Sequence, residues 1–168
     1  MRCTSCEADV PVTARFCPSC AAPILKETDV KGPADVTLEW LTSILELQGY
    51  KVDAAKENDT LIAQHESNPT LLISLMKKIS LIGIQTTWKI KKPAWGQKTD
   101  LLAAINKANS IHWLCTCALS DSMDHVYVSS ALFLTERISS RDILSFIDVY
   151  LAGIGVAIDN SGLRDFAL

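Results

Sequence analysis

Four of the six cysteines lie within the first twenty residues, and their spacing constrains this part of the chain more than any other feature of the sequence. Cys3 is paired with Cys6, and Cys17 with Cys20, each as Cys-x-x-Cys. Such a turn brings two thiolates to one side of a tight backbone knuckle, and two facing knuckles place four sulfur atoms at the corners of a tetrahedron. We therefore expect these four cysteines to bind one structural Zn2+ ion.

The residues between the two pairs contain few apolar side chains, so the metal has to supply the folding energy. Zinc contributes ~10–16 kcal/mol to peptides of this kind, and we expect the segment to be unfolded without it. A redox dithiol is the alternative, but thioredoxin-like pairs occur singly and precede a helix in a βαβ context, which is absent. Four thiolates leave no open coordination position, which argues against catalytic zinc.

Residues 1–25 resemble the short zinc-ribbon modules at the N-termini of many bacterial proteins. Those modules read Cys-x-x-Cys-Gly followed by Phe-Cys-x-x-Cys-Gly, and residues 16–20 (Phe-Cys-Pro-Ser-Cys) match the second knuckle. The sequence departs from the pattern at both glycines, which are replaced by Glu7 and Ala21. Because glycine readily adopts positive φ, we expect the two knuckle turns to be slightly strained while all four ligands are kept.

The composition of the chain is that of a globular protein, with 48% hydrophobic and 21% charged residues. The net charge of −3 argues against a general binder of nucleic acids or anionic membranes. No apolar run approaches the ~18 residues of a membrane-spanning helix, and the first residues have no apolar signal core. We expect a cytoplasmic protein, in which cysteines are metal ligands or buried thiols rather than disulfides.

Polar residues 26–33, which end in Gly-Pro, are typical of a linker. They divide the chain into a zinc ribbon at residues 1–25 and a domain at residues 34–168 that is long enough to bury its own core. In this domain a helix is predicted after a cap at Asp35 and ends at Gly49.

Extended runs follow at residues 50–56, 61–66, 71–76 and 79–90. In the last run Ile82 and Ile84 alternate with Gln85 and Thr87, which predicts a strand with one buried face. A second helix is predicted at residues 98–109, a hairpin from strands 112–119 and 125–132, and a long final helix capped by Ser139. The order α-β-β-β(β)-α-β-β-α, with helices packed on a mostly antiparallel sheet, defines the class as α+β.

Two short motifs carry a resemblance for this larger domain. They are residues 45–50 (Leu-Glu-Leu-Gln-Gly-Tyr) and residues 104–109 (Ala-Ile-Asn-Lys-Ala-Asn). The domain resembles the YbjN family, described as candidate bacterial sensory transduction regulators, which shares the fold of the type III secretion chaperones. The resemblance covers nearly all of residues 34–168 and implies a fold and a protein-handling role, without implying any chemistry. We expect Asn106 and Asn109 to cap the end of the second helix and its loop.

Cys115 and Cys117 are separated by one residue in a predicted strand, so both side chains point to one face. A soft-metal or redox pair is one interpretation of this spacing. His112 would lie on the opposite face and cannot complete such a site. Free cysteines are among the most commonly buried residues, and we favour a place in the core.

The other chemically capable side chains have structural explanations. His65 and His125 have no second ligand at a recognisable spacing. Asp121 and Asp124 could form a carboxylate pair, but their Ser/Asp hairpin favours hydrogen bonds to the nearby backbone. The sequence contains no nucleophile elbow, phosphate loop or dinucleotide motif. We therefore expect no enzymatic activity.

The order of charges along the larger domain is uneven. Residues 67–99 carry six lysines and no acid, whereas residues 35–66 carry seven acids and two bases, and residues 100–168 carry eight acids and four bases. This basic segment, which includes Trp88 and Trp95, could bind an acidic partner or the acids of a second copy. A solvated outer strand explains it equally well.

The leading hypothesis is a non-enzymatic protein-interaction or chaperone-like regulatory module. In it the larger domain forms a homodimer and presents a sheet or groove to a polypeptide partner, while the zinc ribbon adds a second contact surface. The alternative is a nucleic-acid-associated regulator that binds through the ribbon. The zero net charge of the ribbon, and Phe16 as its single aromatic residue, argue against that alternative.

Overall fold

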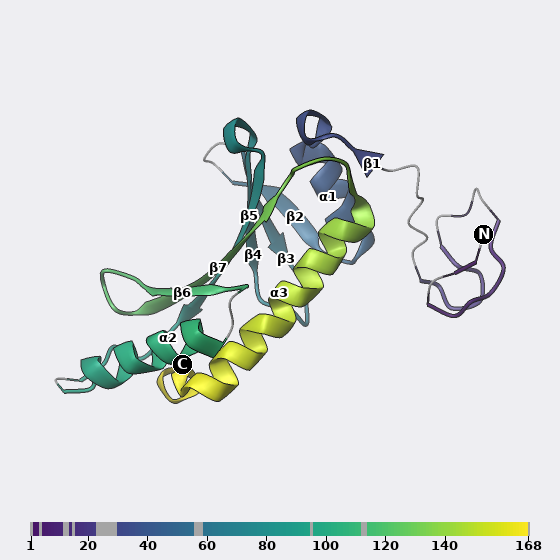
Figure 1. Ribbon diagram of the computed structural model, residues 1–168. Coiled ribbons are helices and arrows are strands. Elements are labelled where there is room, and N and C mark those ends of the chain that lie inside the picture. Colours follow the sequence, from purple (N-terminus) through teal and green to yellow (C-terminus); the bar gives the residue numbers. More distant parts are fainter. Residues whose placement is uncertain are drawn as a thin grey trace.

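The computed structural model describes residues 2–3, 5–11, 14, 16–22, 30–55, 59–94, 96–111 and 114–167 (Figure 1). Its helices and strands are β1 (Val30–Lys31), α1 (Leu38–Leu47), β2 (Lys51–Ala54), β3 (Thr60–Gln64), β4 (Leu71–Met76), β5 (Leu81–Lys89), α2 (Lys98–Ile111), β6 (Thr116–Leu119), β7 (His125–Phe133), β8 (Ile138–Ser139) and α3 (Ser140–Ser161). Short 3-10 turns are η1 (Pro33–Asp35), η2 (Lys77–Ile79) and η3 (Leu163–Phe166). The α+β class predicted from the sequence is confirmed.

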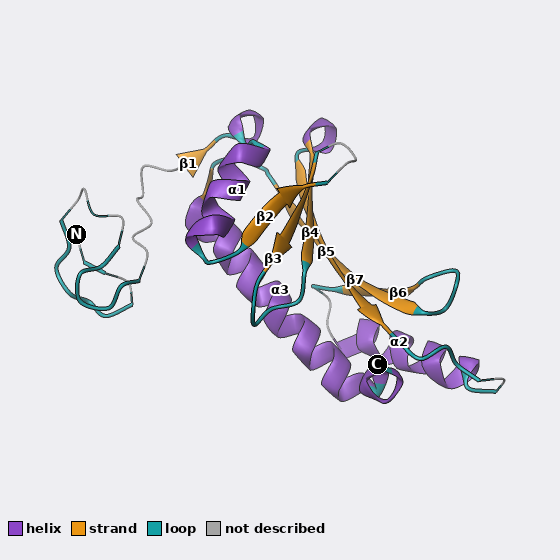
Figure 2. Ribbon diagram, turned by 180° about the vertical axis from the view of Figure 1, so that it is seen from behind, coloured by secondary structure: helices purple, strands orange, loops and turns teal. Residues whose placement is uncertain are grey.

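The main sheet has six strands in the order β2-β3-β4-β5-β7-β6, and every neighbouring pair is antiparallel. The longest pairing joins β5 to β7, from Leu81 opposite Phe133 to Lys89 opposite His125. Helices α1, α2 and α3 lie on one side of this sheet, and none of the described helices covers the other side (Figure 2). The predicted hairpin of β6 and β7 is present.

The two faces of β5 differ as the alternation of its residues predicts. Ile82 and Ile84 are buried toward the helices, each with 2% of its surface exposed. Gln85 is partly exposed and Thr87 is exposed on the opposite face. We call that opposite side of the sheet the open face.

Helix α1 begins later than the sequence suggested. Thr37, and not Asp35, is its N-cap, because the Thr37 Oγ1 atom accepts a hydrogen bond of 3.2 Å from the N–H of Trp40. Asp35 belongs to the 3-10 turn η1, which Pro33 starts. The helix ends before Gly49, whose φ of 85° turns the chain into β2.

Helix α3 has the N-cap that the sequence predicts. The hydroxyl of Ser139 accepts a hydrogen bond from the N–H of Asp142, and the carboxylate of Asp142 accepts one of 2.8 Å from the N–H of Ser139. This reciprocal capping box satisfies two N–H groups at the start of the helix. Gly162, with a φ of 90°, ends α3 and turns the chain into η3.

The stretch at residues 26–33, interpreted as a linker, contains a paired strand in its second half. Val30 lies opposite Ser139 and Lys31 opposite Ile138, so that β1 and β8 form a two-stranded sheet. Residues 23–29 lie outside the described residues. Regular structure thus includes Val30 and Lys31, ahead of residue 34. The division into two domains stays a prediction.

Buried residues form two clusters, a large one between the sheet and its helices and a small one that contains Cys3, Val10 and Cys17. Near the middle of the large cluster Tyr150, 1% exposed, donates a hydrogen bond of 2.6 Å to the carbonyl oxygen of Val128. That bond ties α3 to β7. Among the described residues, none of the helices combines the length and apolarity needed to cross a bilayer.

Candidate functional site

The four N-terminal cysteines converge on one point. Their sulfur atoms all lie within 4.8 Å of one another. The Sγ atoms of Cys3 and Cys20 are 3.7 Å apart, and those of Cys6 and Cys17 are 3.6 Å apart. A tetrahedral site with a metal–sulfur distance of about 2.3 Å has sulfur–sulfur edges of about 3.8 Å. The described thiols therefore have the donor chemistry and the spacing of a four-coordinate metal site.

Hydrogen bonds close the first knuckle, which runs from Cys3 to Ala8. The N–H of Ser5 donates to the sulfur of Cys3 at 3.4 Å, and the N–H of Glu7 donates to its carbonyl oxygen at 2.9 Å. The N–H of Cys3 donates to the carbonyl oxygen of Ala8 at 2.9 Å. Together these bonds wrap the backbone around the first sulfur.

The second knuckle repeats the same bonds fourteen positions further along the sequence. The N–H of Ser19 donates to the sulfur of Cys17 at 3.4 Å, and the N–H of Ala21 donates to its carbonyl oxygen at 2.8 Å. The N–H of Cys17 donates to the carbonyl oxygen of Ala22 at 2.8 Å. The two halves of the site are therefore equivalent in backbone structure.

Glu7 and Ala21 stand where zinc ribbons carry glycine, and both adopt the left-handed conformation. Their φ angles are 59° and 58°. For residues with a Cβ atom this region is unfavourable. The expectation that the two substitutions leave the knuckles slightly strained agrees with these angles.

Backbone N–H groups also acidify one thiol of each knuckle. The pKa of Cys3 is lowered chiefly because the N–H of Ser5 bonds its sulfur. At Cys17 burial opposes ionisation, but the N–H groups of Ser19 and Cys20 outweigh it and hold the pKa at about 6.

The opposite holds for the second thiol of each knuckle. Although the N–H groups of Ala8 and Ala22 bond these sulfurs, the neighbouring thiols and burial raise the pKa of Cys20, and that of Cys6 to about 12. One thiol of each pair is therefore the more readily ionised, and the thiolate is the form that binds metals.

The other two cysteines lie in the core, as the sequence predicts. Cys115 and Cys117 are each 4% exposed. Burial disfavours the thiolate and raises the pKa of the Cys115 thiol to about 11. Both thiols are therefore protonated near neutral pH, and His112 lies outside the described residues.

Asn109 has a role that the sequence pattern did not indicate. The sequence assigned it, with Asn106, to capping the end of α2 and its loop, and for Asn109 that assignment is wrong. Its side chain instead bonds the backbone of Cys117 in β6 at both the carbonyl and the N–H. Asn106 is exposed on the same helix. The interaction joins α2 to β6, so no local sequence pattern predicts it.

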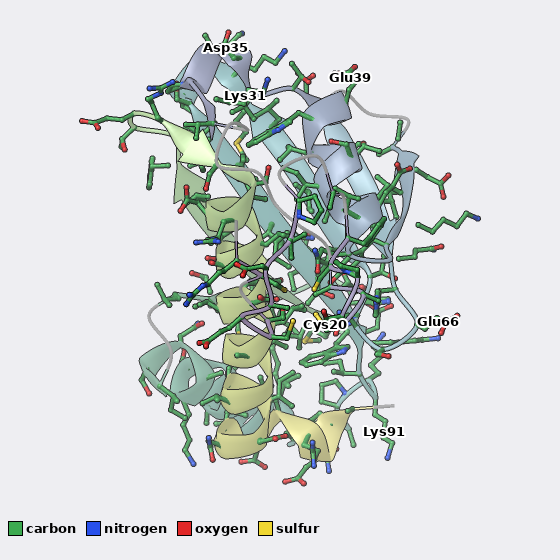
Figure 3. All side chains as sticks on the ribbon, turned by 90° about the vertical axis from the view of Figure 1, so that its right-hand side faces the viewer. Cys20, Lys31, Asp35, Glu39, Glu66 and Lys91 are labelled. Carbon is green, nitrogen blue, oxygen red and sulfur yellow. The ribbon has the colours of Figure 1, made fainter. Side chains whose placement is uncertain are left out.

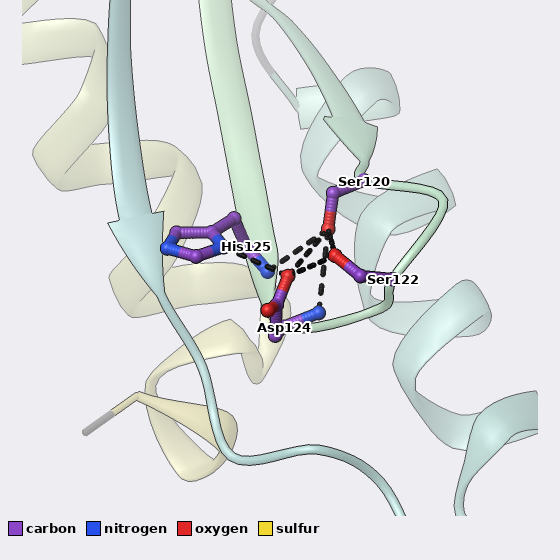
Figure 4. A network of polar contacts seen from close by, with 4 residues as sticks. All are labelled: Ser120, Ser122, Asp124 and His125. Atoms are coloured by element: carbon purple, nitrogen blue, oxygen red, sulfur yellow. Dashed lines mark hydrogen bonds and ion pairs between the residues drawn. The ribbon is translucent and has the colours of Figure 1, made fainter.

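A polar network occupies the turn between β6 and β7 (Figure 4). The Asp124 carboxylate accepts hydrogen bonds from Ser120 at 3.1 Å and from Ser122, and its Oδ1 lies 2.8 Å from Nδ1 of His125. Asp124 takes part in the turn, as predicted, but its carboxylate bonds side chains, while the hydroxyl of Ser120 accepts the bonds from the backbone. The contact of His125 with Asp124 fits the structural explanation given for this histidine. The hydroxyl of Ser122 and the imidazole lower the pKa of Asp124.

This network does not have the geometry of a Ser-His-Asp catalytic triad. In a triad the serine hydroxyl bonds the imidazole, which in turn bonds the carboxylate. Here the hydroxyls of Ser120 and Ser122 converge on the carboxylate of Asp124 and, in the described structure, neither bonds the ring of His125. The described bonds of Asp124 all stabilise the turn, and Asp121 is exposed beside it.

His65 also has structural partners. Its Nδ1 atom accepts a hydrogen bond of 3.1 Å from the N–H of Ser67, and its ring lies 4.9 Å from that of Tyr50. Tyr50 in turn accepts a hydrogen bond from the side chain of Asn68. The imidazole therefore supports the turn that follows β3.

The six lysines of residues 67–99 do not form one basic surface. Lys77 and Lys78 lie in η2, before β5 begins, and the remaining four lie at or beyond its opposite end. The pKa of Glu39 is lowered mainly by hydrogen bonds from its own N–H and from Thr37, and to a smaller extent by the charge of Lys77. Lys91 lies at the opposite end of the molecule from Glu39 (Figure 3). The nine residues of β5 separate the two groups. Trp95 lies outside the described residues.

The open face carries a groove of about 340 Å3 over β4, β5 and β7. Its lining includes Leu72, Met76, Leu81 and Ala131, and none of the residues that line it is charged. Beside it Phe133 is 67% exposed. The alternation of residues in β4 and β7 is the signal in the sequence that could have indicated these apolar positions.

The arrangement of the strands and helices defines an α+β protein with a YbjN-like fold, which carries a cysteine cluster at its N-terminus. One solved structure with this fold is YbjN from E. coli, described as a candidate transcription regulator. It superposes with a TM-score of 0.61 and 14% sequence identity, over 79% of this chain and 96% of that chain. The agreement confirms a YbjN-like fold.

A second similar structure is an uncharacterised protein from Methanothermobacter thermautotrophicus. It has a TM-score of 0.57 and 10% identity, and the match covers 77% of this chain and 99% of that chain. Likeness at these identities shows the fold alone. No family model matches the sequence, and neither does any curated protein.

Proposed function

We propose that this chain is a non-enzymatic, cytoplasmic protein-interaction module with a chaperone-like or regulatory role. The observation that carries the proposal is the open face, the side of the six-stranded sheet that the described helices leave uncovered. Residues that line its groove are apolar or uncharged. An exposed apolar surface of this kind is typical of protein-interaction sites.

The shape of the open face suits an extended polypeptide. The groove follows adjacent strands, and small residues such as Gly83, Ser129 and Ala131 keep its floor low. Met76 and Phe133, which are 43% and 67% exposed, offer apolar side chains to a bound segment. Such a segment would bury these side chains without desolvating any charge of the groove.

Selection from a phage library of random peptides tests this proposal. We expect the wild-type protein to enrich peptides rich in apolar residues. Ala131→Arg places a long charged side chain in the groove and should weaken their binding at least tenfold. Ala152→Arg makes the same change at an exposed position of α3, so it serves as the matched control. Absence of enrichment, or equal binding by Ala131→Arg and Ala152→Arg, would contradict the proposal.

We also propose that the metal held by Cys3, Cys6, Cys17 and Cys20 is one structural Zn2+ ion. Four thiolates at tetrahedral spacing are the donor set that zinc prefers in closed sites, and they leave no position for a substrate. In this view the ribbon is an accessory contact surface. Its fold, like that of other small zinc modules, depends on the metal.

Metal analysis of the purified protein tests this part separately. We expect about one zinc per chain for the wild type and none for the double variant Cys17→Ser, Cys20→Ser. Thermal unfolding of the variant should still show the cooperative transition of residues 30–167. Zinc retained by the variant would contradict the ligand assignment, and loss of the transition would contradict the two-domain division.

The proposal includes a homodimer, as the chaperone-like role suggests. Sedimentation equilibrium at micromolar concentration should give twice the chain mass of 18.4 kDa. A monomer at that concentration would contradict the dimer while leaving the peptide experiment unaffected.

A nucleic-acid-associated regulator is the second candidate, and the description of E. coli YbjN as a candidate transcription regulator favours it. In this case the ribbon would contact nucleic acid through exposed groups such as Arg2 and Phe16. Filter binding at several salt concentrations tests it, because neutralised phosphates give an affinity that falls steeply with salt. We expect weak binding, since the ribbon has no net charge.

A further inference from the structure

A second cavity, on the helix side of the sheet, is not used by the proposed function. It measures about 350 Å3 and lies between the end of β5, the C-terminal part of α3 and the turn η3. Its walls are mainly apolar and include Trp88, Ile90, Val126, Ile158 and Leu163. A volume of this size lies within the range of small-molecule sites, ~300–1,000 Å3.

The C-terminal segment holds the wall of this pocket in place. The N–H of Lys91 donates a hydrogen bond of 2.8 Å to the carbonyl oxygen of Phe166, and Ile90 forms a bridge with Ala167. Gly162 reverses the chain before these contacts. The pocket is thus bounded by backbone hydrogen bonds rather than by loose side chains.

Gly155 leaves one wall of the pocket open. It lies inside α3, where glycine is among the least favourable residues. No atom lies within 4 Å of the position that a Cβ atom would occupy, so close packing does not demand a glycine there. The missing side chain keeps space free in the pocket that most other residues would fill.

Three charged residues line the pocket, Lys89, Asp159 and Arg164, and the last two form an ion pair. Lys89 is exposed and shares the alternation of Gln85 and Thr87 in β5, which directs its side chain toward the open face. Nη2 of Arg164 lies 2.7 Å from Oδ1 of Asp159, and both residues line the pocket. A guanidinium has five N–H donors, and within the described residues Asp159 is the one acidic partner of Arg164. The mouth therefore offers both a donor group and an acceptor group, with opposite charges side by side.

We propose that this pocket binds a free apolar α-amino acid. The apolar side chain would lie against Trp88 and Ile158, the α-carboxylate would accept hydrogen bonds from Arg164, and the α-ammonium would donate to Asp159. A zwitterion complements a neighbouring cation and anion, whereas a simple acid or amine meets one favourable and one unfavourable charge. This proposal is independent of the open face and of the metal site.

Three compounds with the same phenyl group test the proposal: L-phenylalanine, 3-phenylpropionate and 2-phenylethylamine. Titrations followed by two-dimensional 15N NMR report on the amide of Gly155 and the indole of Trp88, which both line the pocket. We expect saturable shifts of both signals with L-phenylalanine. 3-Phenylpropionate and 2-phenylethylamine should each bind at least fivefold more weakly than L-phenylalanine.

Charge variants separate the two polar contacts. Arg164→Gln should weaken the binding of L-phenylalanine and 3-phenylpropionate and leave that of 2-phenylethylamine unchanged. Asp159→Asn should weaken the binding of L-phenylalanine and 2-phenylethylamine and leave that of 3-phenylpropionate unchanged. Both side chains are largely exposed, so the fold should tolerate these changes. Gly155→Leu should abolish binding of all three compounds, because its side chain would fill the pocket.

Val156→Leu is the control for Gly155→Leu, because Val156 is 44% exposed on α3 and does not line the pocket. It should bind L-phenylalanine like the wild type. Absence of saturable shifts at millimolar concentration overturns the proposal. It is equally overturned if Gly155→Leu binds normally, or if the acid or the amine binds as well as L-phenylalanine does.

Discussion

The side-chain amide of Asn109 is bonded at both ends to the backbone of Cys117. Its Nδ2 donates to the carbonyl oxygen at 3.0 Å, and its Oδ1 accepts from the N–H at 2.6 Å. The amide therefore pairs with β6 as a neighbouring strand would. Since β6 lies at the edge of the sheet, this interaction occupies backbone groups that would otherwise be left to water.

Removing this amide should loosen the edge of the sheet. We expect Asn109→Ala to lower the free energy of unfolding by about 1–2 kcal/mol, since two hydrogen bonds are lost at a partly exposed position. Urea unfolding measures the change. Asn106→Ala, at an exposed position of the same helix, is the control and should change stability by less than about 0.5 kcal/mol. Equal effects of the two changes would contradict the role of Asn109.

The buried hydroxyl of Tyr150 should have a measurable effect of its own. Tyr150→Phe removes its bond to the carbonyl oxygen of Val128 and leaves that oxygen without this donor. We expect a loss of about 1–2 kcal/mol in unfolding free energy. Tyr127→Phe makes the same change on the open face, where the residue is partly exposed, and should be nearly neutral. An unchanged stability of Tyr150→Phe would show that the bond contributes little.

Because Glu7 and Ala21 adopt the left-handed conformation, we expect glycine at either position to strengthen metal binding by the four cysteines. Replacing Ala21, whose φ is 58°, by glycine relieves an unfavourable conformation. We expect a gain of ~1 kcal/mol in the metal-bound form, equivalent to about fivefold tighter zinc binding. Competition with a chelator measures this affinity.

The neighbouring residue provides the control for that experiment. Ala22 is not among the residues with positive φ. Ala22→Gly therefore adds only chain flexibility and should weaken zinc binding. Tighter binding by Ala22→Gly, or weaker binding by Ala21→Gly, would be inconsistent with relief of strain. Glu7→Gly should behave like Ala21→Gly.

The buried thiol of Cys115 predicts a loss of stability at high pH. Burial raises its pKa from 9.0 to about 11, so between these values the unfolded chain releases a proton that the folded chain keeps. The contribution of this thiol is full below pH 9 and is lost as the pH rises, by about 1.4 kcal/mol per pH unit.

Comparison with a variant isolates this contribution from other groups. The unfolding free energy of Cys115→Ala should be lower near pH 8, because a buried side chain is lost, but should fall less steeply than that of the wild type between pH 9 and pH 11. Urea unfolding at fixed pH values gives both slopes. Parallel slopes would mean that Cys115 ionises normally in the folded protein.

Local patterns predicted the features whose causes are local. Four cysteines at two Cys-x-x-Cys spacings indicate a cluster because each knuckle closes within a few residues. The start of α3 is indicated by Ser139 with Asp142 three residues later, because this capping box also closes within a few residues. The alternation in β5 predicted its buried face, because strand geometry fixes the side of every second side chain.

Features that depend on distant parts of the chain could not be predicted in this way. The pairing of Asn109 with Cys117 depends on how α2 packs beside β6, and the pairing of Val30 with Ser139 joins residues more than a hundred positions apart. A single basic surface was one of two interpretations of the charge order, the other being a solvated outer strand. The length of β5 separates Lys77 from Lys91, and only the fold reveals this.

The pairing of β1 with β8 has a mechanical consequence. Val30 is hydrogen-bonded into the same short sheet as Ser139, the residue that caps α3. A force applied to the chain before Val30 would therefore reach the first turn of the longest helix without passing through the main sheet. Any partner that pulls on the N-terminal segment would load the two residue pairs of β1 and β8, and the cap of α3 beside them, before it loads the main sheet.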